Sequence, residues 1–333
     1  MARNVRVSTI AWMPGIPPEP TMDDMYRGMR EMCKLAALDK PDIVVIPEGF
    51  NLQAGGGWEQ EGETVPGPST EAFGEIARRH RMYLWCPIVT REAKRRYNAA
   101  VLIGRRGEVV GVCHKMFPTY IELEAGITPG RNVRVLETDF GRVSACICFD
   151  AHFHEVGEAL ARRGAEIVFF PSMFVAERCL MSWVVEYGYF VVTSCGNWSF
   201  IMNNLGRIVA ETGLRFESVA GGHIPAIATA VLNLDTVLLH QDRNQERVKE
   251  IKRKYGAGVQ FDWAQYDSML TLSSTMRDTS AEDIVREFRL LKRQDYFDQS
   301  REACRRQASG VRHQESGVRR QASGVRRQGA GVR

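Results

Sequence analysis

The feature that most constrains the fold is a regular alternation of short apolar runs and longer amphipathic segments over the first 235 residues. Runs such as Ile43–Ile46 and Ile167–Phe170 are apolar at consecutive positions. This pattern is typical of strands that are covered on both faces. The segments between them, among them Asp23–Leu38 and Thr70–Arg81, place apolar residues at helical spacing. Strands that alternate with helices predict an α/β protein built around layered sheets.

The other elements follow from the same periodicities. Ala99–Lys115 reads as a hairpin that turns at Gly104–Gly107, and a capping box from Ser280 to Asp283 predicts a last helix with Ile284, Phe288 and Leu291 on one face. Further strands are expected at Val5–Trp12, Tyr83–Val89, Ala99–Ile103, Val109–Cys113, Val133–Leu136, Val143–Cys148, Phe190–Ser194, Ile208–Ala210 and Ala226–Leu234, and further helices at Glu155–Arg163, Leu180–Tyr189 and Gln245–Tyr255.

Composition excludes several classes of protein. Apolar residues make up 44% of the chain and charged residues 25%, as in an ordinary globular protein. No stretch approaches 18 uninterrupted apolar residues, so we expect no membrane span, and the N-terminus lacks the apolar core of a secretory signal. The eight cysteines form no CxxC pair and lie mostly in apolar runs. We therefore expect neither a disulfide framework nor a zinc site, and a cytoplasmic location.

The basic character of the chain belongs to its C-terminal end. Residues 301–333 hold nine arginines and two glutamates, a local charge of +7, which leaves the rest of the chain at −3. A seven-residue repeat begins at Arg305, Arg312, Arg319 and Arg326 and offers one valine per repeat, too little to bury. We expect residues 300–333 to be disordered and a nucleic-acid partner to be absent, although such a tail could also recruit an acidic partner or be a duplication without a role.

Three chemically reactive side chains stand at the ends of expected strands. Glu48 follows the strand Ile43–Ile46, Lys115 ends the hairpin, and Cys148 ends the strand Val143–Cys148. A carboxylate that takes a thiol proton, a thiolate and an ammonium near a developing oxyanion suffice for nucleophilic catalysis. Each residue alone has an ordinary explanation, as a solvated cap, a surface lysine or a core thiol.

The resemblance of several segments to one family connects these residues. Pro47-Glu48, Tyr97–Ile103 leading into Gly107–Lys115, Thr128-Pro-Gly130 and Ile147–Asp150 look like the nitrilase, or carbon–nitrogen hydrolase, superfamily, and Gly164–Ser172 is similar to that family's next strand. The resemblance runs from about Val5 to Leu234. It implies an α-β-β-α sandwich and assigns residues 1–299 to the hydrolase domain, with a core over 5–235 and an extension over 236–299.

The resemblance also implies roles for individual residues. Glu48 would be the general base, Cys148 the nucleophile, and Lys115 with the backbone N–H of Phe149 the oxyanion hole. A second glutamate of the family would be Glu122 or Glu124, and we prefer Glu122.

Departures from the family pattern indicate which activity within the family is expected. Phe149-Asp150 replaces the Trp-Glu of true nitrilases, and His154 replaces a proline. These differences favour an amidase or an N-carbamoyl hydrolase.

Residues next to these motifs are candidates for the substrate pocket. We expect Phe149, His152, Met173 and Phe174 to line it. His152 could instead contact the pocket residues without touching the substrate. A metal site at His152, His154 and Glu155 is not expected, because a helix begins there. We expect no metal and no cofactor.

The neighbouring thiols Cys146 and Cys148 are expected to point to the same side of one strand. Cys146 should be a buried core thiol with a raised pKa. At the strand end, helix amides and Lys115 should lower the pKa of Cys148.

The sequence therefore predicts a thiol amidohydrolase that cleaves a small linear amide or N-carbamoyl compound through a thioester and releases ammonia or an amine. The resemblance implies a homodimer or larger homo-oligomer. Acyl transfer, nitrile hydrolysis and a non-catalytic scaffold that recruits partners through the basic tail remain alternatives.

Overall fold

The computed structural model describes residues 3–11, 18–196, 198–213, 226–264 and 267–308. Two compact units divide the chain, with the boundary between Asp235 and Thr236. The first unit contains two sheets and the second contains one, and each unit has its own hydrophobic core, so each is described separately. No helix among the described residues combines the length and the apolar character that crossing a membrane requires.

The first unit contains two six-stranded mixed sheets. In spatial order the strands of the first sheet are β12 (Ile227–Asn233), β1 (Asn4–Ile10), β2 (Ile43–Val45), β3 (Tyr83–Glu92), β4 (Arg95–Ile103) and β5 (Val109–His114). Parallel pairing of β1 with β2 and of β2 with β3 forms the centre, and antiparallel strands flank it. The expected hairpin is confirmed as the antiparallel pair β4 and β5.

The strands of the second sheet are, in spatial order, β11 (Ile208–Glu211), β10 (Phe200–Met202), β9 (Phe190–Cys195), β8 (Ile167–Ser172), β7 (Arg142–Ala145) and β6 (Leu136–Glu137). As in the first sheet, the central strands β7, β8 and β9 pair in parallel, and antiparallel strands lie outside them. Strand β10 has no counterpart among the expected strands, and β7 ends three residues earlier than expected.

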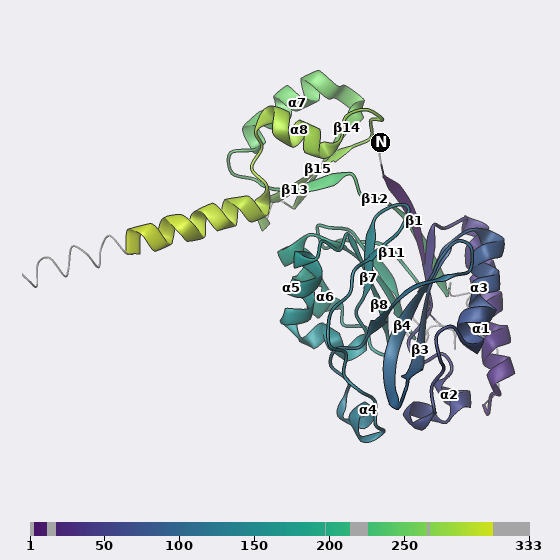
Figure 1. Cartoon of the computed structure of the whole chain (residues 1–333). Coiled ribbons are helices and arrows are strands. Elements are labelled where there is room, and N and C mark those ends of the chain that lie inside the picture. Colours follow the sequence, from purple (N-terminus) through teal and green to yellow (C-terminus); the bar gives the residue numbers. More distant parts are fainter. Residues whose placement is uncertain (1–2, 12–17, 197, 214–225, 265–266, 309–333) are drawn as a thin grey trace, which may run out of the picture. The chain divides into compact units, whose positions relative to one another are not determined.

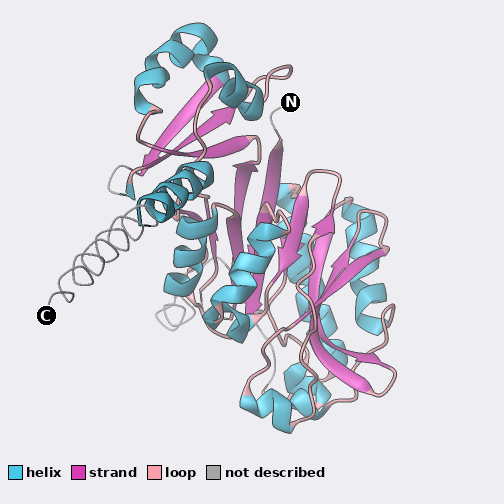
Figure 2. Cartoon of the chain, turned by 60° about the vertical axis from the view of Figure 1, so that its left-hand side comes forward, coloured by secondary structure: helices cyan, strands magenta, loops and turns pink. Residues whose placement is uncertain are grey.

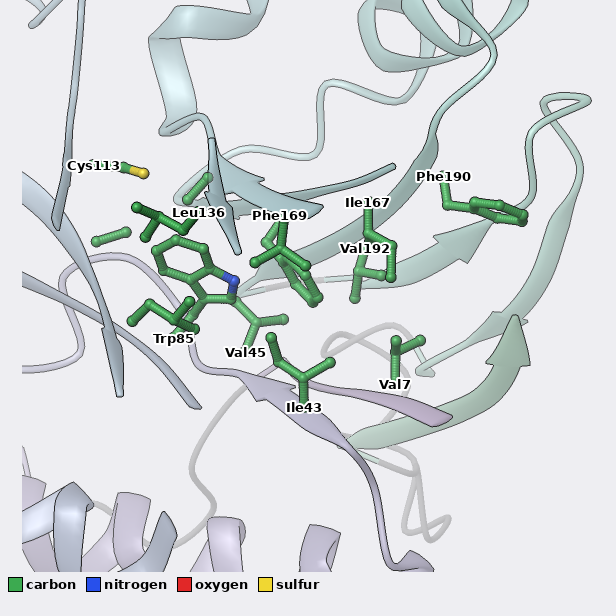
Figure 3. Packing of buried hydrophobic residues seen from close by; sticks show 14 of the residues in the cluster. Val7, Ile43, Val45, Trp85, Cys113, Leu136, Ile167, Phe169, Phe190 and Val192 are labelled. Carbon is green, nitrogen blue, oxygen red and sulfur yellow. The ribbon is translucent and has the colours of Figure 1, made fainter. Parts of the chain in front are cut away.

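Alternate residues of the central strands face different layers. Val45 of β2 belongs to the cluster between the sheets, whereas its neighbour Val44 faces the helices outside. Phe169 and Phe170 of β8 divide in the same way. Figure 3 shows the inner layer, in which Trp85 lies against Phe169, with ring centroids 6.1 Å apart. Because both faces are covered, the strands are apolar at consecutive positions.

Helices cover both outer faces (Figures 1 and 2). Helices α1 (Met22–Ala36) and α3 (Pro68–His80) pack on the first sheet, and α5 (His154–Arg162) and α6 (Glu177–Tyr187) pack on the second. The expected α-β-β-α sandwich is confirmed. The short helical segments are Ala37–Asp39, α2 (Leu52–Gly55), Gly57–Glu59, α4 (Tyr120–Glu124) and Cys148–His152.

The second unit is a small sheet covered by helices. Its core contains Leu239, Ile251, Leu272 and Ile284. The capping box is confirmed, since the Ser280 side chain accepts a hydrogen bond from the backbone of Asp283, but the helix ends before Leu291. The elements are β13 (Thr236–His240), Gln245–Arg247, α7 (Val248–Tyr255), Gly256–Gly258, β14 (Val259–Ala264), β15 (Met269–Ser274) and α8 (Ala281–Phe288), with sheet order β13-β15-β14. Its three strands are not among those that the sequence predicts.

A further helix spans 293–308. Tyr296 at its start stacks on His240, with ring centroids 3.9 Å apart. The expectation of disorder from residue 300 is wrong for 300–308, which are helical although exposed. The rest of the repeat region, 309–333, lies outside the described residues.

Candidate active site

Glu48 lies just beyond the carboxyl end of β2, and its side chain is buried. Its Oε1 accepts hydrogen bonds from Asn98 Nδ2 at 2.7 Å and from Lys115 Nζ at 3.1 Å. Its Oε2 accepts a hydrogen bond from the backbone N–H of Met173 at 3.0 Å. Three donors from three different segments therefore fix the orientation of this carboxylate.

Lys115 directly follows β5 and is 1% exposed. Besides Glu48 it donates to Glu122 Oε2 at 2.7 Å. Burial opposes the charge of the ammonium, but the two carboxylates outweigh burial and raise the pKa of Lys115. The ring of Trp58 lies 5.8 Å from Nζ, which adds a cation–π contact. Lys115 is therefore a fixed cation at neutral pH.

The two candidates for the second glutamate lie in different surroundings. Glu122 is buried in α4 and bonded to Lys115, whereas Glu124 is exposed. The backbone N–H and the hydroxyl of Thr119 both donate to Glu122 Oε2 at 2.8 Å. Burial alone would raise the pKa of Glu122, but Lys115, Asn98 and Thr119 together hold it below its ordinary value.

Asn98 is a member of this cluster that sequence reasoning missed. It comes from β4, and its Nδ2 donates to Glu48 Oε1 and to Glu122 Oε1, both at 2.7 Å. The two amide protons thus serve two carboxylates. A polar side chain inside the apolar run Tyr97–Ile103 was the signal that could have identified it, because a buried amide requires partners.

Cys148 begins the 3-10 helix Cys148–His152 and is 8% exposed. Its φ of 51° lies in the left-handed region, which is strained for a residue with a side chain. Buried Asp150 holds this turn: its Oδ2 accepts from the N–H of Ile147, and its Oδ1 accepts from those of Met116 and Phe117, at 2.8–3.0 Å. Asp150 thus ties the cysteine turn to the segment after Lys115.

The expectations for the two neighbouring thiols need correction. Strand β7 ends at Ala145, so Cys146 and Cys148 do not share a strand face: Cys146 packs in the outer layer under the helices and Cys148 in the layer between the sheets. Burial raises the pKa of Cys146, as expected.

Burial and the negative charge of Glu48 also raise the pKa of Cys148, to about 12. Lys115 and hydrogen bonds from Ser172 and the Met173 amide act in the opposite direction but are outweighed. The expected lowering is wrong, because Cys148 is buried and the carboxylate of Glu48 disfavours a second negative charge beside it.

Three of the four expected pocket residues, Phe149, His152 and Phe174, are joined by ring contacts. His152 stacks on Phe174, with ring centroids 5.3 Å apart, and contacts Phe149 edge to face at 5.2 Å. Met173 is 48% exposed, although its backbone binds Glu48. His152 and His154 are exposed. Within the described residues, no three His, Cys, Asp or Glu side chains are grouped as metal ligands.

Comparison with known proteins places this chain in a family. The carbon-nitrogen hydrolase family model matches residues 14–231. The omega-amidase NIT2 of Homo sapiens is 25% identical over 66% of this chain and 89% of its own length. The beta-ureidopropionase of Arabidopsis thaliana is 26% identical over 63% of this chain and 54% of its own length. The chain thus spans about half the length of some of the curated relatives that it matches.

A solved structure supports the fold assignment. A mutant of the amidase from Nesterenkonia sp. AN1, which shows acrylamide added at its active-site cysteine, has a TM-score of 0.56 and 20% identity. The similarity covers 74% of this chain and 99% of that protein. The resemblance found in the sequence is confirmed, and the chain belongs to the carbon-nitrogen hydrolase family.

Proposed function

We propose that the chain is a thiol amidohydrolase in which Cys148 is the nucleophile, Glu48 the general base and Lys115 the oxyanion-binding cation. The observation that carries this proposal is the buried network in which Lys115 bonds both Glu48 and Glu122 beside a strained, buried thiol. A structural core rarely assembles two carboxylates, an ammonium and a thiol, because each charge costs free energy to bury. Perturbed ionisable groups gathered in this way are typical of active sites.

The reaction follows from the protonation states. The resting thiol of Cys148 is protonated, so its proton passes to Glu48 as Sγ attacks the carbonyl carbon. The oxyanion forms near Lys115 Nζ and the backbone N–H of Phe149. Glu48 then returns the proton to the departing nitrogen, which leaves as ammonia or an amine, and a thioester remains. Water that gives a proton to Glu48 cleaves the thioester, releases the acid and regenerates the thiol.

The roles of the remaining polar groups support this sequence. Glu122 and Asn98 orient Lys115 and Glu48 without contacting Cys148 in any hydrogen bond of the described residues. Since Lys115 already neutralises one of two carboxylates, Glu48 can accept a proton while Glu122 keeps Lys115 charged. The low pKa of Glu122 fits this division of labour.

The substrate class that we propose is a small linear amide or an N-carbamoyl compound. The ring of His152 contacts the rings of Phe149 and Phe174 at the cysteine turn, and an apolar lining of this kind suits a compact substrate. The relatives named above are an omega-amidase, a beta-ureidopropionase and an amidase, which supports the same choice. A homodimer or larger homo-oligomer remains our expectation from the family resemblance, and a cytoplasmic location remains our expectation from the cysteine pattern.

An ammonia-release screen over aliphatic amides, N-carbamoyl amino acids, ureas and nitriles tests the proposal. On the best substrate, Glu48→Gln, Lys115→Ala and Cys148→Ala should each nearly abolish turnover, because residues that act as a unit do not contribute additively. Glu124→Gln and Cys146→Ala are the matched controls and should stay active. Retention of more than about a tenth of turnover by any of the three, a loss of under about 1.4 kcal/mol, would contradict the assignment.

Acyl transfer is the second candidate, because a thioester can react with acceptors other than water. Product analysis with and without hydroxylamine separates the two: hydroxamate that replaces nearly all acid at low hydroxylamine concentration favours a transferase. A wild-type protein that is inactive throughout the screen would favour the scaffold alternative.

A further inference from the structure

Arg96 lies on β4 two residues before Asn98, so both side chains leave the same face of the strand. Asn98 binds the carboxylates, whereas Arg96 binds backbone carbonyls on two separate segments. Its Nη1 donates to the carbonyl oxygens of Trp58, at 3.0 Å, and Gln60, at 2.6 Å. Its Nη2 donates to the carbonyl oxygen of Ala125.

Both segments touch the proposed site. Trp58 places its ring near Lys115, and Ala125 directly follows α4, which carries Glu122. Helices α2 and α4 lie at the same end of the sandwich in Figure 1. The guanidinium of Arg96 therefore joins the segment that places Trp58 near Lys115 to the segment that supplies Glu122.

The C-terminal end of α4 favours the binding of the Arg96 guanidinium. The last carbonyls of a helix lack helical partners and carry partial negative charge, so a cation there is favourable. Gly126, which follows Ala125, has a φ of 82°. A Cβ at this position would lie only 3.0 Å from Arg96 Nη2, so glycine leaves room for the guanidinium. The backbone of Arg96 adds a further tie, since its carbonyl accepts from the N–H of Thr128 at 2.7 Å.

We propose that Arg96 is a positioning residue of the active site, which clamps the Trp58 segment to the end of α4 and so fixes Glu122 and Trp58 around Lys115. The catalytic consequence rests on the proposed function, whereas the clamp itself does not. Arginine suits this role because its planar fork presents several donors in fixed directions, whereas lysine is a single flexible donor group. The three acceptors come from two segments, so lysine can restore only part of the clamp.

Hydrogen exchange tests the clamp without any substrate. The N–H of Gly126 donates to Leu123 and that of Ile127 donates to Glu122, so both report the closure of α4. In Arg96→Met these amides, measured in peptides covering 119–128, should exchange at least about tenfold faster than in wild type, and in Arg96→Lys by less. The matched control is Arg95→Met, at the adjacent exposed position, which should exchange like wild type.

Kinetics on the best amide from the screen test the positioning role. Arg96→Met should lower kcat by about 10- to 100-fold with a smaller change in KM, since misplaced supporting groups impair catalysis more than binding. Arg96→Lys should be intermediate, and added guanidinium chloride at millimolar concentration should partly restore kcat to Arg96→Gly but not to Lys115→Ala. Should Arg96→Met refold poorly, the Arg96→Lys comparison and the guanidinium rescue still decide the question.

The outcomes separate the two proposals. Unchanged exchange over 119–128 in Arg96→Met, or faster exchange with kcat within twofold of wild type, would overturn the positioning role. A wild-type enzyme that hydrolyses no amide would overturn the proposed function, while accelerated exchange in Arg96→Met alone would still establish the clamp.

Discussion

Replacing the Glu48 carboxylate by an amide should make Cys148 more reactive towards alkylating agents even as it abolishes turnover. The raised pKa of Cys148, about 12, comes from burial first and from the charge of Glu48 second. Glu48→Gln removes that charge but keeps the size of the side chain, and Lys115 remains. The pKa of Cys148 should therefore fall in the variant.

The size of the effect can be worked out. A thiol with a pKa of about 12 is ionised in about one molecule in ten thousand at pH 8. A like charge close by raises a pKa by about one to three units, so its loss should return about two. The thiolate fraction would then rise about a hundredfold. Because a less basic thiolate is also a weaker nucleophile, alkylation should accelerate by roughly tenfold.

Timed iodoacetamide labelling with peptide mapping measures this effect. Cys304 is exposed and Cys179 half-buried, so the experiment needs a background with both replaced by serine. Glu48→Asp is the charge-matched control: it keeps the negative charge with altered geometry and should label about as slowly as the parent protein. Glu124→Gln, a neutralisation at an exposed position, should also leave the rate unchanged.

Alkylation of Cys148 in Glu48→Gln that is no faster than in the parent, with melting temperatures alike, would refute the electrostatic coupling. A rise shared by Glu48→Asp would instead assign the effect to loosened packing. Preferential labelling of Cys146 would remove the basis for choosing Cys148 as the nucleophile.

Three further outcomes are expected. Cys146→Ala should cost on the order of 1 kcal/mol in the free energy of unfolding, measured by denaturant titration, and leave turnover unchanged, because Cys146 packs under the helices; a loss of turnover without a loss of stability would contradict its placement. The folded-state pKa of Glu122 lies below 4.5, so its charge should stabilise the fold above that pH. The difference in the free energy of unfolding between wild type and Glu122→Gln should therefore shrink as the pH falls below 4.5 and not as the pH rises. Removal of 309–333 should leave turnover on a small amide within about twofold, because the repeats offer no catalytic group and little to pack; a collapse of activity would show that the repeats act on the enzyme.

The sequence alone determined the layers of the first unit. Runs such as Ile43–Ile46 are apolar at every position because one half of their side chains meets the other sheet and the other half meets helices. Strand ends are visible in the same pattern, so Glu48, Lys115 and Cys148 could be picked out as candidates. The family resemblance supplied their order but not their contacts.

The second unit shows where periodicity fails. Strands β13 and β15 of this unit carry threonine or serine among their apolar residues. The core that the helices cover is small and contains only residues between Val237 and Leu290. Such short, mixed patterns do not distinguish a strand from a loop. The helix over 293–308 is polar and its last residues are exposed, so no apolar stripe marked it.

Only the tertiary structure decided how the site is assembled. Asn98 meets Glu48 across 50 residues of chain and Glu122 across 24, and Arg96 joins segments that neither spacing nor composition relates. The early end of β7 and the positive φ of Cys148 turned that thiol away from the layer of Cys146. Periodicity records which faces are buried, whereas convergence depends on strand register and on single turns, which local sequence does not encode.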